Sequence, residues 1–266
     1  MERRLALVTG ASAGIGAAFA RILASHGYDV ALTARRTDRL EKLADEISLR
    51  YGIETLTVAA DLAEPEAPGQ ILDYLTAHGR AVDALVNNAG YGLAGSYGDT
   101  RWEDQKAFIQ VMMTAPAELA HRVLPGMAHR RFGRIVNVAS LAGLVPGSAG
   151  HTLYGATKSF LIKFSQSLHL EAVSQGVHVT ALCPGFTYSE FHDVNGTRAQ
   201  ISASTPPWLW LGADEVAAAG YEAVEANRPI CVPGAPNKAI AAFSKLIPDD
   251  WALALMASQG PRFRKT

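Results

Sequence analysis

Tyr154 and Lys158 stand four residues apart in the segment YGATK, which has a helical pattern. Residues at this spacing share one helix face, so a phenol and an amine project from the same surface. Reduction of a carbonyl needs a proton donor for the developing alkoxide, and a tyrosine can serve if its pKa falls from about 10 toward neutral. An ammonium at about 4 Å contributes about 4 kcal/mol at an effective dielectric near 20, enough for a shift of about three units. The pair therefore predicts general acid–base chemistry.

Ser140 is a third candidate, because it ends the apolar strand pattern FGRIVNVAS directly before this helix. In open parallel sheets, ligands bind outside the carboxyl ends of the strands, which is where Ser140 is expected. Its hydroxyl could hydrogen-bond a substrate oxygen and stabilise developing charge. This chemistry assigns no role to a metal. Taken alone, the YxxxK spacing is common, and the alternative is an interface tyrosine beside a surface lysine.

The segment TGASAGIG follows the first strand pattern, LALVT, and opens a helical pattern. Glycines allow a tight turn and close approach of a pyrophosphate, and the free N–H groups of a helix N-terminus favour an anion. The spacing is GxxxGxG rather than GxGxxG, and a strand-to-helix turn without a ligand is the alternative. The predicted contacts are Gly10, Ser12, Gly14, Ile15 and Gly16.

Arg35 and Arg36 end the second strand pattern, where an NAD site would have an acidic residue. An arginine fork suits a 2′-phosphate, so NADP(H) is favoured over NAD(H). Asp38 is the competing ribose ligand, but it fits better as a first-turn acid of the next helix. Asp61 and Leu62 end the third strand pattern, where an adenine could rest. Asn88, Ala89 and Gly90, in the segment NNAG, end the fourth.

Strand patterns alternate with helical ones from residue 5 to about 185, with one helical segment at about 100–129. This alternation predicts an α/β fold with a parallel sheet covered on both faces. A proline- and tryptophan-containing segment at about 189–211 is interpreted as an insertion over the open end of the sheet. A helix at about 213–226, a short strand at 229–233 and a helical C-terminus follow. We predict one domain over residues 1–266.

Composition favours a small-molecule partner. The 266 residues are 48% hydrophobic and 18% charged with a net charge of −1, which gives no bulk attraction to nucleic acid. Cys183 and Cys231 are interpreted as buried, reduced thiols. No apolar run approaches the roughly 18 residues of a spanning helix, and the N-terminal run is too short for a signal peptide. The cytoplasm is the expected location.

Taken together in this order, TGASAGIG, NNAG, Ser140, YGATK and CPG resemble the short-chain dehydrogenase/reductase family over about residues 3–190. The resemblance implies a doubly wound Rossmann-type sheet of about seven strands, and a homodimer or homotetramer. It implies Tyr154 as the catalytic acid/base, Lys158 as a ribose ligand that lowers the phenol pKa, and Ser140 as the substrate-orienting hydroxyl. The segment CPGFTYS resembles the loop that meets the nicotinamide, with contacts from Pro184, Gly185, Phe186 and Thr187.

The sequence departs from the family pattern at Met112, where relatives usually have an asparagine of a proton relay to the lysine. A thioether cannot replace an amide, so we expect slowed or rewired proton exchange rather than loss of activity. Met112 is also the one feature that favours a dinucleotide-binding protein without catalysis.

An apolar lid over the substrate is one interpretation of Phe191, Trp208 and Trp210. The other is that these side chains pack against the domain or a partner subunit, and the sequence leaves both open. His151 and His192 flank the predicted site and are interpreted as solvated or backbone-bonded.

Overall fold

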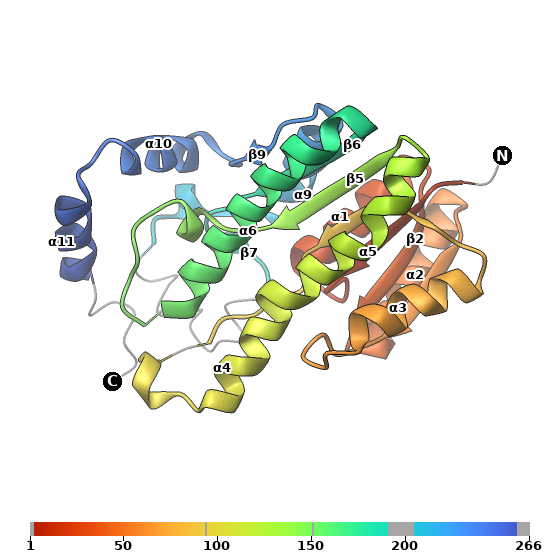
Figure 1. Ribbon diagram of the computed structural model, residues 1–266, viewed down its shortest axis with the longest axis horizontal. Helices are drawn as coiled ribbons and strands as arrows, with labels where there is room; N and C mark the ends of the chain where they lie inside the picture. The colour runs from red at the N-terminus through yellow and green to blue at the C-terminus, as the bar shows by residue number, and fades with distance from the viewer. Residues whose placement is uncertain (1–2, 94, 151, 191–204, 260–266) are drawn as a thin grey trace.

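A seven-stranded parallel sheet forms the centre of the computed structural model, which describes residues 3–93, 95–150, 152–190 and 205–259 (Figure 1). The strand order is β3-β2-β1-β4-β5-β6-β9, so the doubly wound sheet predicted from sequence is confirmed. The chain reverses its direction of winding between β1 and β4, and ligands of such sheets bind at this switch point. The strands are β1 (Leu5–Thr9), β2 (Asp29–Ala34), β3 (Thr55–Ala59), β4 (Val82–Asn87), β5 (Gly133–Val138), β6 (Val177–Leu182) and β9 (Ile230–Cys231).

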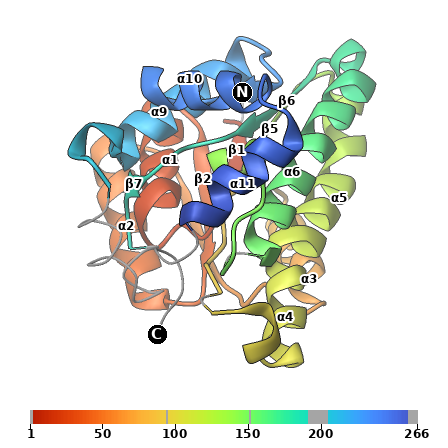
Figure 2. The same ribbon diagram turned by 90° about the vertical axis from the view of Figure 1, so that its left-hand side faces the viewer.

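Helices cover both faces of the sheet, as Figure 2 shows with the strands between two helical layers. Strand side chains alternate between the layers: Ala6 and Val8 belong to one buried core, and Leu5 and Leu7 to the other. One layer contains α1 (Gly14–Ser25), α2 (Thr37–Tyr51) and α9 (Ala213–Glu225). The other contains α3 (Ala67–Ala77), α4 (Trp102–Ile109), α5 (Ala115–His129) and α6 (Thr152–Ala172).

Two elements differ from the sequence interpretation. Helix α3 was not identified from the sequence; it contains Pro68 in its first turn, where proline is well tolerated. The helical segment predicted around residues 100–129 is divided: α4 passes through a π-helical turn, Gln110–Thr114, into α5. Such turns are rare and occur often at functional sites. This one places Met112 in the core.

The predicted insertion is framed by two short strands, β7 (Thr187–Tyr188) and β8 (Leu211–Gly212), which pair in parallel. Trp210 is buried and its ring stacks on Tyr188 at 4.9 Å between centroids, whereas Trp208 is 66% exposed. Trp210 therefore packs on the domain rather than serving as a lid. Residues 191–204, which include Phe191 and His192, and residue His151 lie outside the described part.

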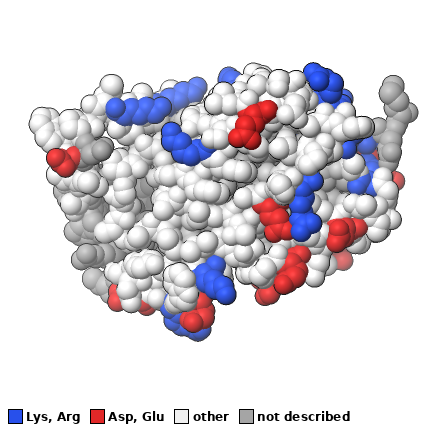
Figure 3. Space-filling view, in the orientation of Figure 1, with Lys and Arg blue, Asp and Glu red and all other residues white. Residues whose placement is uncertain are grey.

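The C-terminal helices α10 (Ala235–Ser244) and α11 (Asp249–Gln259) lie beyond the carboxyl ends of the strands, at the left of Figure 1. Cys183 and Cys231 are free thiols at adjacent strand ends; Cys183 is buried, as predicted, whereas Cys231 is only partly buried. Within the described ranges, no helix is long and apolar enough to cross a bilayer. On the face drawn in Figure 3, basic and acidic side chains are interspersed rather than gathered into one basic patch.

Candidate active site

A cavity of about 1040 Å³ opens at the carboxyl ends of the strands. It extends from the glycine turn after β1 to the C-terminal helices. Of the residues predicted to form the catalytic and coenzyme sites, all except Gly16 line it. Sequence positions as distant as Gly10 and Pro184 therefore meet in one space, as the switch-point geometry requires.

The glycine turn has the backbone geometry of an anion site. Gly10 and Gly14 have φ values of 64° and 55°, in the left-handed region that favours glycine. Gly16 packs so closely against the turn that a Cβ there would lie 2.4 Å from the carbonyl oxygen of Gly10. Helix α1 begins at Gly14 with no side-chain cap and no acid in its first turn. Its first N–H groups can therefore bind a pyrophosphate.

The side chain of Asn88 holds this turn in place. Its Nδ2 donates to the carbonyl oxygens of Thr9 and Gly10, at 2.9 and 3.2 Å. The hydroxyl of Thr9 accepts hydrogen bonds from the backbone N–H groups of Asn88 and Ala89. The end of β4 is thereby fastened to the end of β1.

Arg35 and Arg36 both line the cavity, whereas Asp38 does not and lies in the first turn of α2. Arg36 donates from Nη2 to the hydroxyl of Ser12 at 2.9 Å, which links the second strand to the glycine turn. Arg35 is more exposed and forms a loose ion pair with Asp61 at 3.8 Å. This arrangement favours the arginines over Asp38 as the group that meets the adenine ribose.

Ser140 and Tyr154 are hydrogen-bonded to each other on the cavity wall. Ser140 has an extended backbone and its Oγ accepts the N–H of Ala142 at 3.1 Å, which fixes the hydroxyl before a short 3-10 turn. That turn packs directly on α6, because a Cβ on Gly143 would lie 2.6 Å from the carbonyl carbon of Lys158. The serine loop and the tyrosine helix are thus held as one unit.

Burial raises the pKa of Tyr154, and the hydrogen bond with Ser140 offsets part of that rise. This direction is opposite to the lowering expected from sequence. Lys158 is itself only 5% exposed, and its Nζ donates to the carbonyl oxygen of Val138 at 2.7 Å. Burial lowers the pKa of Lys158 to about 8. The ammonium lies 5.7 Å from the centroid of the Tyr154 ring, on the same helix face as predicted.

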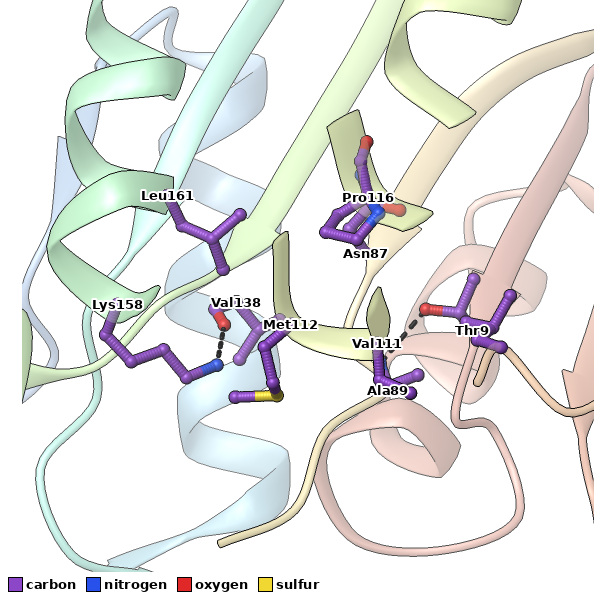
Figure 4. A pocket seen from close by; sticks show the side chains of 10 residues that line it. Thr9, Asn87, Ala89, Val111, Met112, Pro116, Val138, Lys158 and Leu161 are labelled. Atoms are coloured by element: carbon purple, nitrogen blue, oxygen red, sulfur yellow. Dashed lines mark hydrogen bonds between the residues drawn. The ribbon is translucent and has the colours of Figure 1, made fainter. Parts of the chain in front are cut away.

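Met112 lies beside Lys158 at a small cavity of about 10 Å³, shown in Figure 4. This volume is close to that needed for one water molecule. Asn87 also lines the cavity, and its buried Oδ1 has no hydrogen-bond partner among the described residues. The position at which the family resemblance predicted a relay amide is therefore filled by a thioether, next to the Asn87 amide oxygen, which can still accept a hydrogen bond.

Replacing Met112 with asparagine is expected to raise kcat several-fold, because an amide there could bond a water beside Lys158 and speed proton exchange. Turnover under saturating coenzyme and substrate would measure the effect. Met113→Asn, a half-buried neighbour on the same π-helical turn, is the matched control. A buried amide without partners costs about 1–3 kcal/mol, so urea unfolding should accompany the kinetics. An unchanged or lower rate in a stably folded Met112→Asn protein contradicts the relay hypothesis.

The other end of the cavity is lined by residues that sequence reasoning missed. They lie in loops and C-terminal helices that carry no motif, and their only shared signal is apolar character. These residues include Leu93, Val145, Pro146, Leu209, Ile240, Phe243, Ile247 and Ala252. Charged lining residues other than Lys158 are Arg35, Arg36, Asp61 and Glu190, all at the glycine-turn end. Among the described residues, the far end therefore presents no charged side chain.

Asn237 is a buried residue that positions the loop after β6. Its side chain fills the space beside Gly185, where a Cβ would lie 2.4 Å from Oδ1. Nδ2 of Asn237 also donates to the carbonyl oxygen of Pro233 at 2.9 Å. The start of α10 thereby supports the CPG turn.

Comparison with known proteins gives a consistent result. The family model described as short chain dehydrogenase matches residues 4–199. An uncharacterized oxidoreductase of Myxococcus xanthus is 37% identical over 195 residues, covering 73% of this chain and 76% of the relative. An NADP-dependent 3-hydroxy acid dehydrogenase of Salmonella typhi is 35% identical, with coverage of 85% and 84%. A short-chain dehydrogenase from Sphingobium yanoikuyae, solved in complex with NADPH, superposes with a TM-score of 0.80 at 31% identity, covering 96% and 95%.

Proposed function

Because this chain belongs to the short-chain dehydrogenase/reductase family of NAD(P)-dependent oxidoreductases, we propose that it interconverts a carbonyl and a secondary alcohol on an apolar small molecule with NADP(H). The observation that carries the proposal is one cavity with Ser140, Tyr154 and Lys158 on its wall and Arg35 and Arg36 at its end. We propose a homodimer or homotetramer on the family resemblance alone.

In the proposed mechanism, the glycine turn and the N-terminus of α1 would hold the pyrophosphate, and Arg36 would bind the 2′-phosphate. When bound, NADP(H) supplies or accepts the hydride. Ser140 orients the substrate oxygen, and Tyr154 Oη gives its proton to the oxygen as negative charge develops there. The raised pKa of Tyr154 keeps the phenol protonated and ready to donate at neutral pH. Lys158 would return a proton to Tyr154; its ammonium lies 5.7 Å from the centroid of the tyrosine ring, which supports this role.

The substrate proposed is bulky, apolar and uncharged. The far end of the cavity offers apolar surface from loops and from α10 and α11, with no charged side chain among the described residues that line it. A substrate carboxylate there would be desolvated without an ionic partner, which is costly. A hydroxy acid is therefore a poorer fit for this chain than a neutral ketone.

A panel of ketones and alcohols tests the function directly. Turnover would be followed with NADPH for ketones and NADP for alcohols, with matched neutral and carboxylate-bearing members of similar size. The Tyr154→Phe protein serves as the blank. Activity confined to the carboxylate-bearing members would contradict the proposed substrate class, and absence of turnover with every member would favour the non-catalytic binding protein.

Replacing Arg36 with alanine is expected to raise the Kd for NADPH about 10- to 100-fold, because a charge-assisted contact to the 2′-phosphate is lost. The Kd for NADH should change by less than about twofold, since that coenzyme has no phosphate there. Fluorescence titration with both coenzymes measures this, with Arg35→Ala as a second probe. Arg21→Ala, which breaks an arginine–glutamate pair away from the cavity, is the control. Equal weakening of both coenzymes, or tighter binding of NADH by the unmodified protein, would favour the NAD-dependent alternative.

A further inference from the structure

Glu190 already pairs with Arg36, one of the two arginines proposed to meet the 2′-phosphate, and with Arg39 in the first turn of α2. Its Oε2 accepts a hydrogen bond from Arg36 Nη1 at 2.8 Å, and its Oε1 accepts one from Arg39 Nη1. The side chains of Glu190 and Arg36 are 39% and 41% exposed, so solvent and ligands can reach the pair. Arg36 and then Arg39 lower the pKa of Glu190 through these hydrogen bonds. The carboxylate is therefore a full negative charge at neutral pH.

The donors of Arg36 are divided between two partners. Nε and Nη2 face the hydroxyl of Ser12, at 3.3 and 2.9 Å, while Nη1 faces Glu190. Ser12 belongs to the glycine turn and binds Arg36 as a neutral group. An incoming phosphate that uses the guanidinium fork must therefore exchange with Glu190 or share Arg36 with it. Sharing would bring the carboxylate and the phosphate close together, which is unfavourable because like charges repel.

The chain holds Glu190 at this place. The preceding residue, Ser189, crosses the glycine turn so closely that a Cβ on Gly14 would lie 2.9 Å from the Ser189 Cβ. Ser189 and Glu190 line the same cavity as Ser12 and Arg36. The carboxylate is thus delivered to the coenzyme end by the loop that follows β7, not by a distant surface side chain.

We propose that Glu190 is a coenzyme-specificity residue, which holds the place of the 2′-phosphate on Arg36 and Arg39 and is displaced when NADP(H) binds. The inference rests on the proposed preference for NADP(H). NAD(H) has a hydroxyl at that position and leaves the Glu190 contacts intact. Glu190 therefore reduces the difference in binding affinity between NADP(H) and NAD(H), because only the coenzyme with a 2′-phosphate must break these ion pairs.

Replacing Glu190 with glutamine is expected to lower the Kd for NADPH about three- to tenfold, as two exposed ion pairs no longer compete with the phosphate. The Kd for NADH should stay within about twofold. Adenosine 2′,5′-bisphosphate and ADP, titrated by calorimetry, isolate the adenosine half of the coenzyme without any catalytic step. The gain should appear with the bisphosphate and not with ADP. Glu118→Gln, which removes a glutamate paired with Arg122 on α5, changes the net charge equally and serves as the control.

Several outcomes overturn the proposal. An unchanged Kd for NADPH in Glu190→Gln would mean that Glu190 has no effect on coenzyme binding, and a higher Kd would mean that it helps to position Arg36. Equal tightening of both coenzymes, or the same gain in Glu118→Gln, would mean a general charge effect. The gain must also shrink in an Arg36→Ala background. Failure of the proposed function looks different: the unmodified protein would then bind NADH at least as tightly as NADPH, and Arg36→Ala would not discriminate between them.

Discussion

Replacing Tyr154 with phenylalanine should lower kcat by about 10²- to 10⁴-fold, the range that a positioned general acid contributes. The substitution removes only the hydroxyl, so the ring keeps its packing on the half-buried wall of the cavity. Coenzyme affinity should stay within about threefold. Steady-state turnover of a reactive ketone with NADPH, together with fluorescence titration of NADPH, separates the loss of chemistry from a loss of binding.

The pH dependence of the unmodified protein provides a second readout for Tyr154. Burial raises the pKa of its hydroxyl above 10, so the protonated form that donates in ketone reduction persists throughout the neutral range. The tyrosine-dependent part of the reduction rate should therefore stay flat from pH 7 to about 9 and fall only above about 10. Alcohol oxidation needs the deprotonated form, so its rate should rise as the pH increases from 7 to about 10.

Tyr91→Phe is the matched control for this experiment. Tyr91 also lines the cavity, and burial likewise raises its pKa, but it stands outside the serine–tyrosine–lysine group. Its loss should change kcat by less than about threefold. If Tyr154→Phe retains more than a tenth of the activity, or if Tyr91→Phe is equally impaired, Tyr154 is not the proton donor.

The sheet could be predicted because its determinants are local. Strand segments such as β5 and β6 are rich in β-branched residues and are buried at all but one position, as strands covered on both faces must be, and each is followed by a short turn. The polar site residues follow from this order, since the carboxyl ends of parallel strands share one edge. Ser140 and Tyr154 accordingly meet as expected.

What the sequence did not reveal depends on contacts between distant segments. Glu190 meets Arg36 across 154 positions, and no motif connects them. Leu209 and Phe243 reach the cavity from a loop and a C-terminal helix whose placement is set by packing alone. The pKa direction of Tyr154 was also missed, because helix spacing gives the proximity of Lys158 but not the burial of both groups.

Replacing Lys158 with methionine should reduce kcat at least about 10²-fold, comparable to the loss of one donor that stabilises a developing charge. The same change should make stability respond differently to pH. Burial lowers the pKa of Lys158 to about 8 in the folded protein, against 10.5 as its ordinary value. Its charge therefore costs on the order of 3 kcal/mol at pH 7, a cost that methionine removes.

The sign follows from proton counting. Between about pH 8 and 10.5 the unfolded chain binds more protons at Lys158 than the folded one, so this residue's contribution to stability rises with pH. The penalty is fully present below pH 8 and disappears above 10.5. The free energy of unfolding of Lys158→Met, relative to that of the unmodified protein, should thus be about 2 kcal/mol higher at pH 7.5 than at pH 9.5.

The comparison between the two proteins isolates Lys158, because groups that titrate identically in both cancel. The Cys183 thiol interacts with Lys158, but burial raises its pKa to about 12, so in the folded proteins it stays protonated at both pH values used. Loss of the hydrogen bond to the Val138 carbonyl costs about 1–3 kcal/mol, but it does so equally at both pH values. Urea unfolding at pH 7.5 and 9.5 measures the change. Lys163→Met, an exposed lysine of the same helix, should alter the free energy of unfolding by less than about 0.5 kcal/mol at either pH. The free energies of unfolding of Lys158→Met and the unmodified protein could instead differ by the same amount at both pH values. In that case the buried ammonium is not destabilising, and the prediction that burial lowers the pKa of Lys158 is wrong.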